Sequence, residues 1–181
     1  LALSFGMPIP MTAVQILWMN LVTEGIQDVT LALESKEPDL MQRPPRKPRE
    51  PIFNRQMIEQ CVVIAAYVSI LSFGLYYYLY EMRGVDVTAA RNTVLLFLVS
   101  LNNFHAFNCR SETRSAFRIP LRANPVLILG VVGAQATHIL AMHLPGLNSV
   151  LEISPVPLYE WGVIFALASS IVFAGELYKL I

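Results

Sequence analysis

The sequence predicts an all-α membrane protein: a polytopic helix bundle with five full transmembrane spans and the stub of a preceding helix. Of its 181 residues, 55% are hydrophobic and only 14% are charged, whereas soluble domains carry about 25% charged residues. The apolar residues gather in long runs, and a helix needs about 20 of them to cross a bilayer. The formal net charge is zero, which gives no indication of a nucleic-acid partner. The expected environment is the lipid bilayer.

The spans are separated by polar or proline-rich loops, within one domain that covers 1–181. Leu1–Phe5 is interpreted as the end of an earlier helix, followed by a tight turn at Gly6–Pro10. The loop 34–55 contains five prolines, which fix φ and favour an extended chain. The predicted spans run from about 11–33, 57–80, 92–108, 125–144 and 159–178.

The distribution of cations predicts the orientation. Most lysines and arginines lie in the loops after the first and third spans or, as Lys179, beyond the last span, whereas the alternate loops hold only Arg83 and Arg91. Positively charged loops tend to face the cytoplasm, so we expect an external or luminal N-terminus and a cytoplasmic C-terminus. An external N-terminus without a signal segment is expected of a piece of a longer protein whose earlier helices are missing.

The first span carries polar side chains in its middle. A carboxylate near the bilayer centre costs at least ~2.5 kcal/mol, so two of them need an explanation. On an α-helix, residues three and four apart share one face. Gly25 should weaken the helix and let backbone carbonyls turn toward the same place. A stripe of oxygen ligands therefore predicts a cation site, built from Asn20, Thr23, Glu24, Gln27 and Asp28.

These polar residues also have structural interpretations. Asn20 and Glu24 could be a hydrogen-bonded pair that holds helices together, although an ionisable group inside a membrane favours a functional role. Thr23 could instead bond the carbonyl four residues earlier. Asp28 could be a lower cation position, a proton carrier, or the ion-pair partner of the basic loop.

Two features of the fourth span are interpreted as structural. His138 lies deep in the span and needs a buried partner, such as Gln135 or a group on a neighbouring helix. The small residues Gly130, Gly133 and Ala134 are typical of a face that packs closely against another helix.

Two motifs resemble those of P-type cation-transporting ATPases, in particular the calcium-pump branch. The sixth membrane helix of that family and its following loop resemble NLVTEG at Asn20–Gly25 and PDLMQRPPRKPREP at Pro38–Pro51. The eighth helix and the loop after it resemble HAFNCRSETRSAFRIPLRANP at His105–Pro125. The resemblance covers essentially the whole chain and implies the C-terminal part of the transport domain, from the end of helix five to helix ten.

The resemblance implies an ATP-driven pump, with calcium as the transported cation and manganese, sodium and potassium as alternatives. It places the phosphorylated aspartate and the nucleotide site upstream, since no DKTGT motif occurs here. Mg²⁺ and ATP should therefore bind only through upstream domains, and this fragment alone should be inactive, without catalytic or cofactor-binding residues. Its expected partners are the bilayer and the upstream helices and cytoplasmic catalytic domains of the same pump.

The resemblance also implies a set of ligands. The sixth-helix pattern is an asparagine, a threonine three residues on, and then an aspartate; Asn20 and Thr23 match, and Glu24 keeps the carboxylate on a longer side chain. Asn102 stands where sarcoplasmic-reticulum-type pumps supply a glutamate to one of two sites, which favours a single site here. Its neighbour Asn103 is expected to pack. The candidate metal ligands are Asn20, Thr23, Glu24, Asn102 and, without a family counterpart, Asp28.

Two other classes of protein are alternatives: a secondary cation transporter and a non-catalytic membrane scaffold. A secondary transporter should show internal repeats with paired broken helices, and no second segment like NLVTEG occurs in the sequence. A scaffold has no need for carboxylates and amides on one helix face. The pump is the favoured prediction.

Overall fold

The described part of the chain consists of helices, turns and irregular segments, without strands. The computed structural model describes residues 1–36, 40–42, 55–111 and 113–180. Most of the proline-rich loop lies outside these residues, and with it most of the motif Pro38–Pro51. The prediction of an all-α fold is confirmed. Within these residues, three helices are long and apolar enough to cross a membrane, Arg55–Met82, Pro125–His143 and Leu158–Lys179; the full set of five spans stays a prediction.

The main helical segments are α1 (Ala13–Trp18), η2 (Met19–Glu24), α2 (Gly25–Leu31), α3 (Arg55–Tyr77), η4 (Tyr78–Met82), α4 (Val87–Asn108), α5 (Pro125–His143), α6 (Leu147–Leu151) and α7 (Leu158–Leu180). Short 3₁₀ turns are η1 (Ala2–Phe5), η3 (Leu40–Gln42), η5 (Ala116–Arg118) and η6 (Leu121–Ala123).

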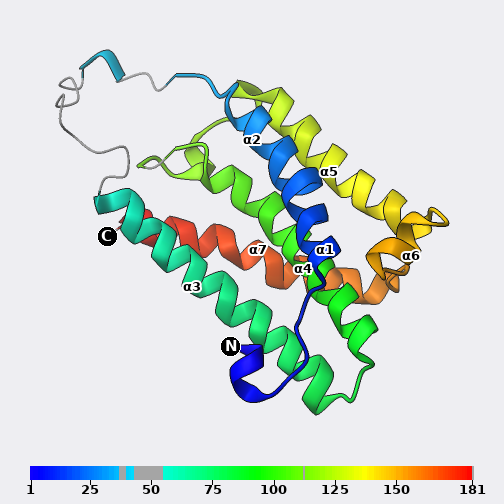
Figure 1. Ribbon diagram of the computed structural model, residues 1–181. Coiled ribbons are helices and arrows are strands. Elements are labelled where there is room, and N and C mark those ends of the chain that lie inside the picture. The colour runs from blue at the N-terminus through cyan, green and yellow to red at the C-terminus, as the bar shows by residue number, and fades with distance from the viewer. Residues whose placement is uncertain (37–39, 43–54, 112, 181) are drawn as a thin grey trace.

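Helix α4 forms the centre of the bundle. It lies between the α1–α2 segment and α5 on one side and α3 and α7 on the other (Figure 1), and its most extensive packing is against α7. Every residue from Val94 to Leu101 is buried. A helix that is buried all round must be apolar all round, and this part of α4 has only Ser100 as a polar residue.

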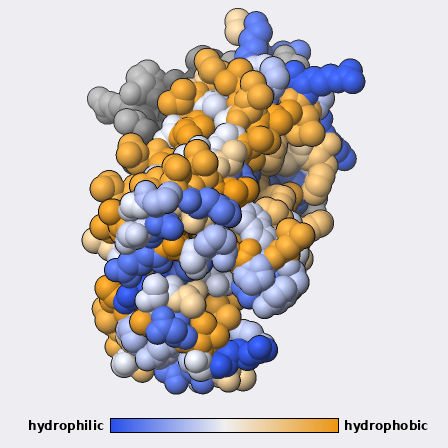
Figure 2. Space-filling model, turned by 90° about the vertical axis from the view of Figure 1, so that its right-hand side faces the viewer, coloured by the Kyte–Doolittle hydropathy of each residue, from blue (hydrophilic) through white to orange (hydrophobic). Residues whose placement is uncertain are grey.

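The outer helices expose large apolar side chains. Ile70 on α3, Leu129 on α5 and Phe173 on α7 all lie on the surface. Figure 2 shows one face on which hydrophobic residues cover much of the surface. Exposed apolar area of this extent is unfavourable in water and is expected of helices that face lipid. The fold is that of a membrane protein.

Local sequence explains where two of the helices begin. Thr12 and Gln15 form a capping box at α1: the Gln15 N–H donates to Thr12 Oγ1 and the Thr12 N–H to Gln15 Oε1, at 3.3 and 3.0 Å. Asn124 accepts from the N–H of Leu127 at 3.0 Å and is followed by Pro125 in the first turn of α5, where proline is favoured.

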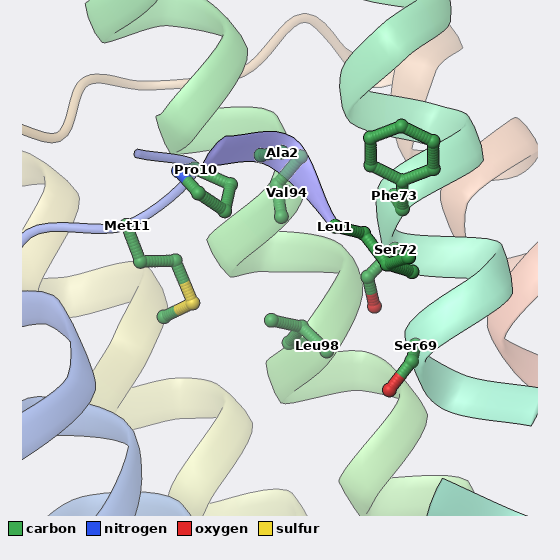
Figure 3. Close-up of a pocket in the computed structure, with 9 residues that line it drawn as sticks. All are labelled: Leu1, Ala2, Pro10, Met11, Ser69, Ser72, Phe73, Val94 and Leu98. Carbon is green, nitrogen blue, oxygen red and sulfur yellow. The ribbon is translucent and has the colours of Figure 1, made fainter. Parts of the chain in front are cut away.

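The N-terminal segment lies across the gap between α3 and α4. The predicted helix stub is a single 3₁₀ turn, η1, which ends at Gly6 with a φ of +70°, a conformation that glycine adopts without strain. Figure 3 shows Leu1 beside Ser72 and Phe73 of α3, above Leu98 of α4. These residues line a cavity of about 220 Å³.

Close packing between α2 and α5 depends on Gly130. A Cβ atom at Gly130 would lie 2.6 Å from Thr30 Cγ2, whereas one at Gly133 would meet nothing within 4 Å. The predicted close-packing face is therefore confirmed for Gly130 and wrong for Gly133, which points away from its neighbours.

We expect Gly130→Ala to destabilise the full-length protein by about 1–3 kcal/mol, because overpacking forces the helices apart. Gly133→Ala is the matched control and should leave stability unchanged or slightly raised, since alanine favours helix. The measurement is the thermal midpoint of the detergent-solubilised protein. Equal midpoints for the two variants would contradict the close contact.

Candidate cation site

The first predicted span is a continuous helix whose middle is wider than an α-helix. Segment η2 is π-helical, and the N–H of Gly25 donates to the carbonyl oxygen of Asn20, five residues earlier. Gly25 itself keeps helical angles, φ −58° and ψ −39°. Gly25 was expected to weaken the helix and let carbonyls turn toward the site; the helix departs from α-geometry just before Gly25 but widens without breaking, and the turning of the carbonyls stays a prediction. Short π segments inside α-helices are frequent at functional sites.

The five polar side chains predicted to share one face of this helix differ in burial. The hydrogen bond from the Gly25 N–H to Asn20 spans five residues instead of four, so the turn that carries Asn20 and Glu24 departs from regular α-helical spacing. Thr23 and Gln27 are 1% and 5% exposed and pack into the bundle. Glu24 is half-buried, and Asn20 and Asp28 are exposed, whereas Thr23 and Gln27 are buried.

The structure brings Glu24 and Asn102 together. The Asn102 amide, on α4, donates from Nδ2 to Glu24 Oε1 at 3.3 Å, and both side chains are half-buried. An amide that turns about its Cβ–Cγ bond presents its oxygen in place of its nitrogen. The same two side chains can therefore offer carboxylate and amide oxygens to a cation between them.

Thr23 adds an unsatisfied oxygen on the same turn. Its Oγ1 is buried and makes no hydrogen bond within the described residues, so the alternative in which it bonds the carbonyl four residues earlier is not realised. An unpaired buried hydroxyl costs about 1–3 kcal/mol, which a ligand would recover. The alternative that pairs Asp28 with the basic loop 34–55 concerns residues most of which lie outside the described part of the chain; with the described residues, Asp28 makes no ion pair.

Comparison with known proteins assigns the chain to a family. Residues 8–181 match the family described as "Cation transporting ATPase, C-terminus". The chain belongs to the cation-transporting ATPases. It is 32% identical over 170 residues to the "Probable cation-transporting ATPase F" of Mycobacterium tuberculosis, covering 94% of this chain and 19% of that protein. The P-type ATPase resemblance is confirmed.

Relatives of this ATPase domain include proteins named for calcium. The "Calcium-transporting ATPase 1" of Schizosaccharomyces pombe is 29% identical over 97% of the chain, and the human "Calcium-transporting ATPase type 2C member 2" is 30% identical over 97%. The chain spans 19% of the length of each of these proteins. It is similar to the C-terminal fifth of such pumps, and the activity of the whole protein is a matter for proposal.

Behind Glu24, the ATPase domain has a row of three amides that joins three helices. Gln27 Nε2, on α2, donates to Asn103 Oδ1, on α4, at 2.6 Å, and Asn103 Nδ2 donates to Gln135 Oε1, on α5, at 2.8 Å. Gln135 Nε2 has no partner within the described residues. Asn103 was expected only to pack, because a sequence pattern shows which residues share a helix but not which side chains meet across helices.

His138 is paired with a neighbouring helix, one of the two predicted alternatives. It is fully buried, and its Nδ1 accepts from Trp18 Nε1, on α1, at 3.2 Å. Gln135, the other candidate partner, belongs to the amide row. One turn before Trp18, the buried Gln15 amide donates to the carbonyl oxygen of Leu151 at 2.9 Å. Polar contacts therefore fix the site-bearing helix against α5 and α6 along its length.

Proposed function

We propose that the chain is the ion-site half of an ATP-driven P-type cation pump and that the pump transports calcium. Membership of the cation-transporting ATPases and the similarity to two relatives named as calcium-transporting ATPases support this. The observation that carries the proposal is the contact of Glu24 with Asn102 at a π-helical turn, inside a bundle whose outer helices are apolar.

The proposed ligands come from two helices. Calcium takes about six to eight oxygens at 2.3–2.6 Å. Glu24 can supply two, and Thr23, Asn20 and Asn102 one each, so water or parts of the pump outside this chain must supply the rest. Asn20 is exposed and therefore accessible to such parts. Asp28, also exposed, is proposed as an outer carboxylate that attracts the cation. The chain alone should bind calcium weakly.

Transport requires that the site open alternately to each side of the membrane. In the proposed cycle, phosphorylation of the upstream domains shifts the population between two helix arrangements that differ in cation affinity. Glu24 would exchange its cation for protons when the ion leaves, since an unpaired charge within a membrane is costly. We also propose that the chain crosses the membrane five times, with an external or luminal N-terminus and a cytoplasmic C-terminus.

The test is ATP hydrolysis by the purified full-length protein against calcium, manganese, sodium and potassium. We expect stimulation by calcium at the lowest concentration. Asn102→Ala removes one ligand and should raise the half-maximal calcium concentration about tenfold, which corresponds to about 1.4 kcal/mol. Asn148→Ala, on the peripheral α6, is the matched control. Activation by another cation alone, or equal curves for both variants, would contradict the proposal.

A further inference from the structure

A second polar junction ties the same helices together beyond the predicted end of the first span. Arg110, directly after α4, is 1% exposed at its side chain, and Glu34, after α2, is 14% exposed. Arg110 Nε donates to Glu34 Oε2 at 3.0 Å and Arg110 Nη2 to Glu34 Oε1 at 2.8 Å. Two parallel bonds between a guanidinium and a carboxylate fix direction as well as distance.

The junction extends to the start of α5. Arg110 donates to the carbonyl oxygens of Ile119 and Pro120, at 3.2 and 3.1 Å. Asn124, which caps α5, donates to Glu34 Oε2 at 3.0 Å and to the carbonyl oxygen of Thr30 at 2.9 Å. The Glu34 carboxylate therefore binds Arg110, after the end of α4, and Asn124, at the start of α5. Asn124 also binds the last turn of α2 through the carbonyl oxygen of Thr30.

The position of this junction relative to the site follows from helix geometry. Glu34 comes ten residues after Glu24, and Arg110 comes eight after Asn102, which on helices corresponds to about 12–15 Å. Between the two contacts lies the bond from Gln27 to Asn103. The helices that carry the proposed ligands are thus joined at both ends of one short, rigid stretch, so a shift at the junction changes the separation of the ligands.

We propose that Arg110 is a positioning residue for the cation site, acting through Glu34 to fix the separation of Glu24 and Asn102. The inference rests on the proposed function. Arg110 does not touch the ion: its charge is balanced by Glu34, so its influence comes from geometry. Calcium affinity depends on how well the ligand oxygens are held, and a lysine, as a flexible point charge, cannot reproduce the two-bond geometry of arginine.

The test uses the full-length pump with Arg110→Lys and Glu34→Asp, which keep both charges and alter the geometry. We expect the calcium concentration that gives half-maximal ATP hydrolysis to rise about threefold to tenfold. The maximal rate should stay within about twofold of the wild-type rate. Equilibrium calcium binding should show the same loss of affinity. Arg55→Gln is the control, since Arg55 forms an ion pair with Glu59 but its side chain is 92% exposed; its calcium dependence should equal that of the wild type.

Two results would overturn the inference separately from the proposed function. If wild-type hydrolysis responds to calcium and both charge-conserving variants fold with wild-type affinity, the positioning role is wrong and the pump stands. If the variants instead give less folded protein and a lower maximal rate but keep the calcium affinity of the wild type, the junction is a purely structural element and the positioning role is wrong. If the wild type does not respond to calcium at all, the proposed function fails, and the positioning role fails with it.

Discussion

Substitution of Glu24 by glutamine is expected to abolish calcium-stimulated ATP hydrolysis by the full-length pump. Glutamine has nearly the same shape and can still bond Asn102, so the change removes the charge and little else. Loss of one member of a buried charged pair costs about 2 kcal/mol or more, which is at least about 30-fold in affinity. The measurement is hydrolysis against calcium concentration, together with equilibrium binding of calcium.

Asp28→Asn is the informative comparison for Glu24→Gln. Its carboxylate is exposed, and exposed charges contribute about 1 kcal/mol or less, so calcium affinity should fall by at most about fivefold. Glu59→Gln, at the exposed start of α3, should have no effect. Wild-type calcium dependence in Glu24→Gln would show that the site is misplaced, and abolition by Asp28→Asn alone would move its centre to Asp28.

The second large effect concerns stability. Arg110→Met is expected to destabilise the protein by about 3–5 kcal/mol, because it leaves the Glu34 carboxylate largely buried and without its cationic partner. Burial by itself raises the pKa of Glu34, but hydrogen bonds from Arg110 and Asn124 and the charge of Arg110 hold that pKa below its ordinary value of 4.5. Without Arg110, the burial remains and most of the compensation is lost.

The sign of this pKa shift predicts how the effect depends on pH. A carboxylate whose pKa is lowered by folding stabilises the protein above its unfolded pKa, and this contribution is lost as pH falls through the folded pKa. The stability of the wild type should therefore exceed that of Arg110→Met most at neutral pH. The difference should shrink as the pH falls toward 4.5, because the unpaired Glu34 of the variant takes up its proton there, and shrink further below about pH 4.5 as the wild-type carboxylate is protonated.

The measurement for Arg110→Met is the thermal midpoint of the detergent-solubilised full-length protein between pH 7 and 4. Arg55→Met, which disrupts the exposed ion pair with Glu59, should change the midpoint little at any pH. A difference between Arg110→Met and the wild type that stays constant down to pH 4 would contradict the assigned role of the Glu34 charge.

The helical architecture could be predicted because hydrophobic runs and caps are local signals. The segment predicted from 125 to 144 contains α5, Pro125–His143, whose start is marked by Asn124 and Pro125. The π turn was not among the predicted features, since helical periodicity assumes a regular α-helix. The predicted polar face contains both buried and exposed residues.

The candidate site was predictable only in part. Glu24 could be singled out because a carboxylate within an apolar run needs a reason, and Asn102 because of the family resemblance; the structure places them in contact. Gln135 and Arg110 gave no such signal: a glutamine in a span and an arginine in a basic loop have ordinary explanations. Their roles arise from contacts across 32 and 76 residues of chain, which helical periodicity does not encode.

The hydrogen bonds in the row formed by Gln27, Asn103 and Gln135 all run in one direction. Each amide gives its nitrogen to the next oxygen in the direction from α2 to α5, so the row ends in an oxygen at Gln27 and in an N–H group at Gln135. If one amide reversed, two nitrogens or two oxygens would face each other, and hydrogen bonds in such chains reinforce one another. The three side chains can therefore reverse only together, as a single two-position unit beside the helix that carries Glu24.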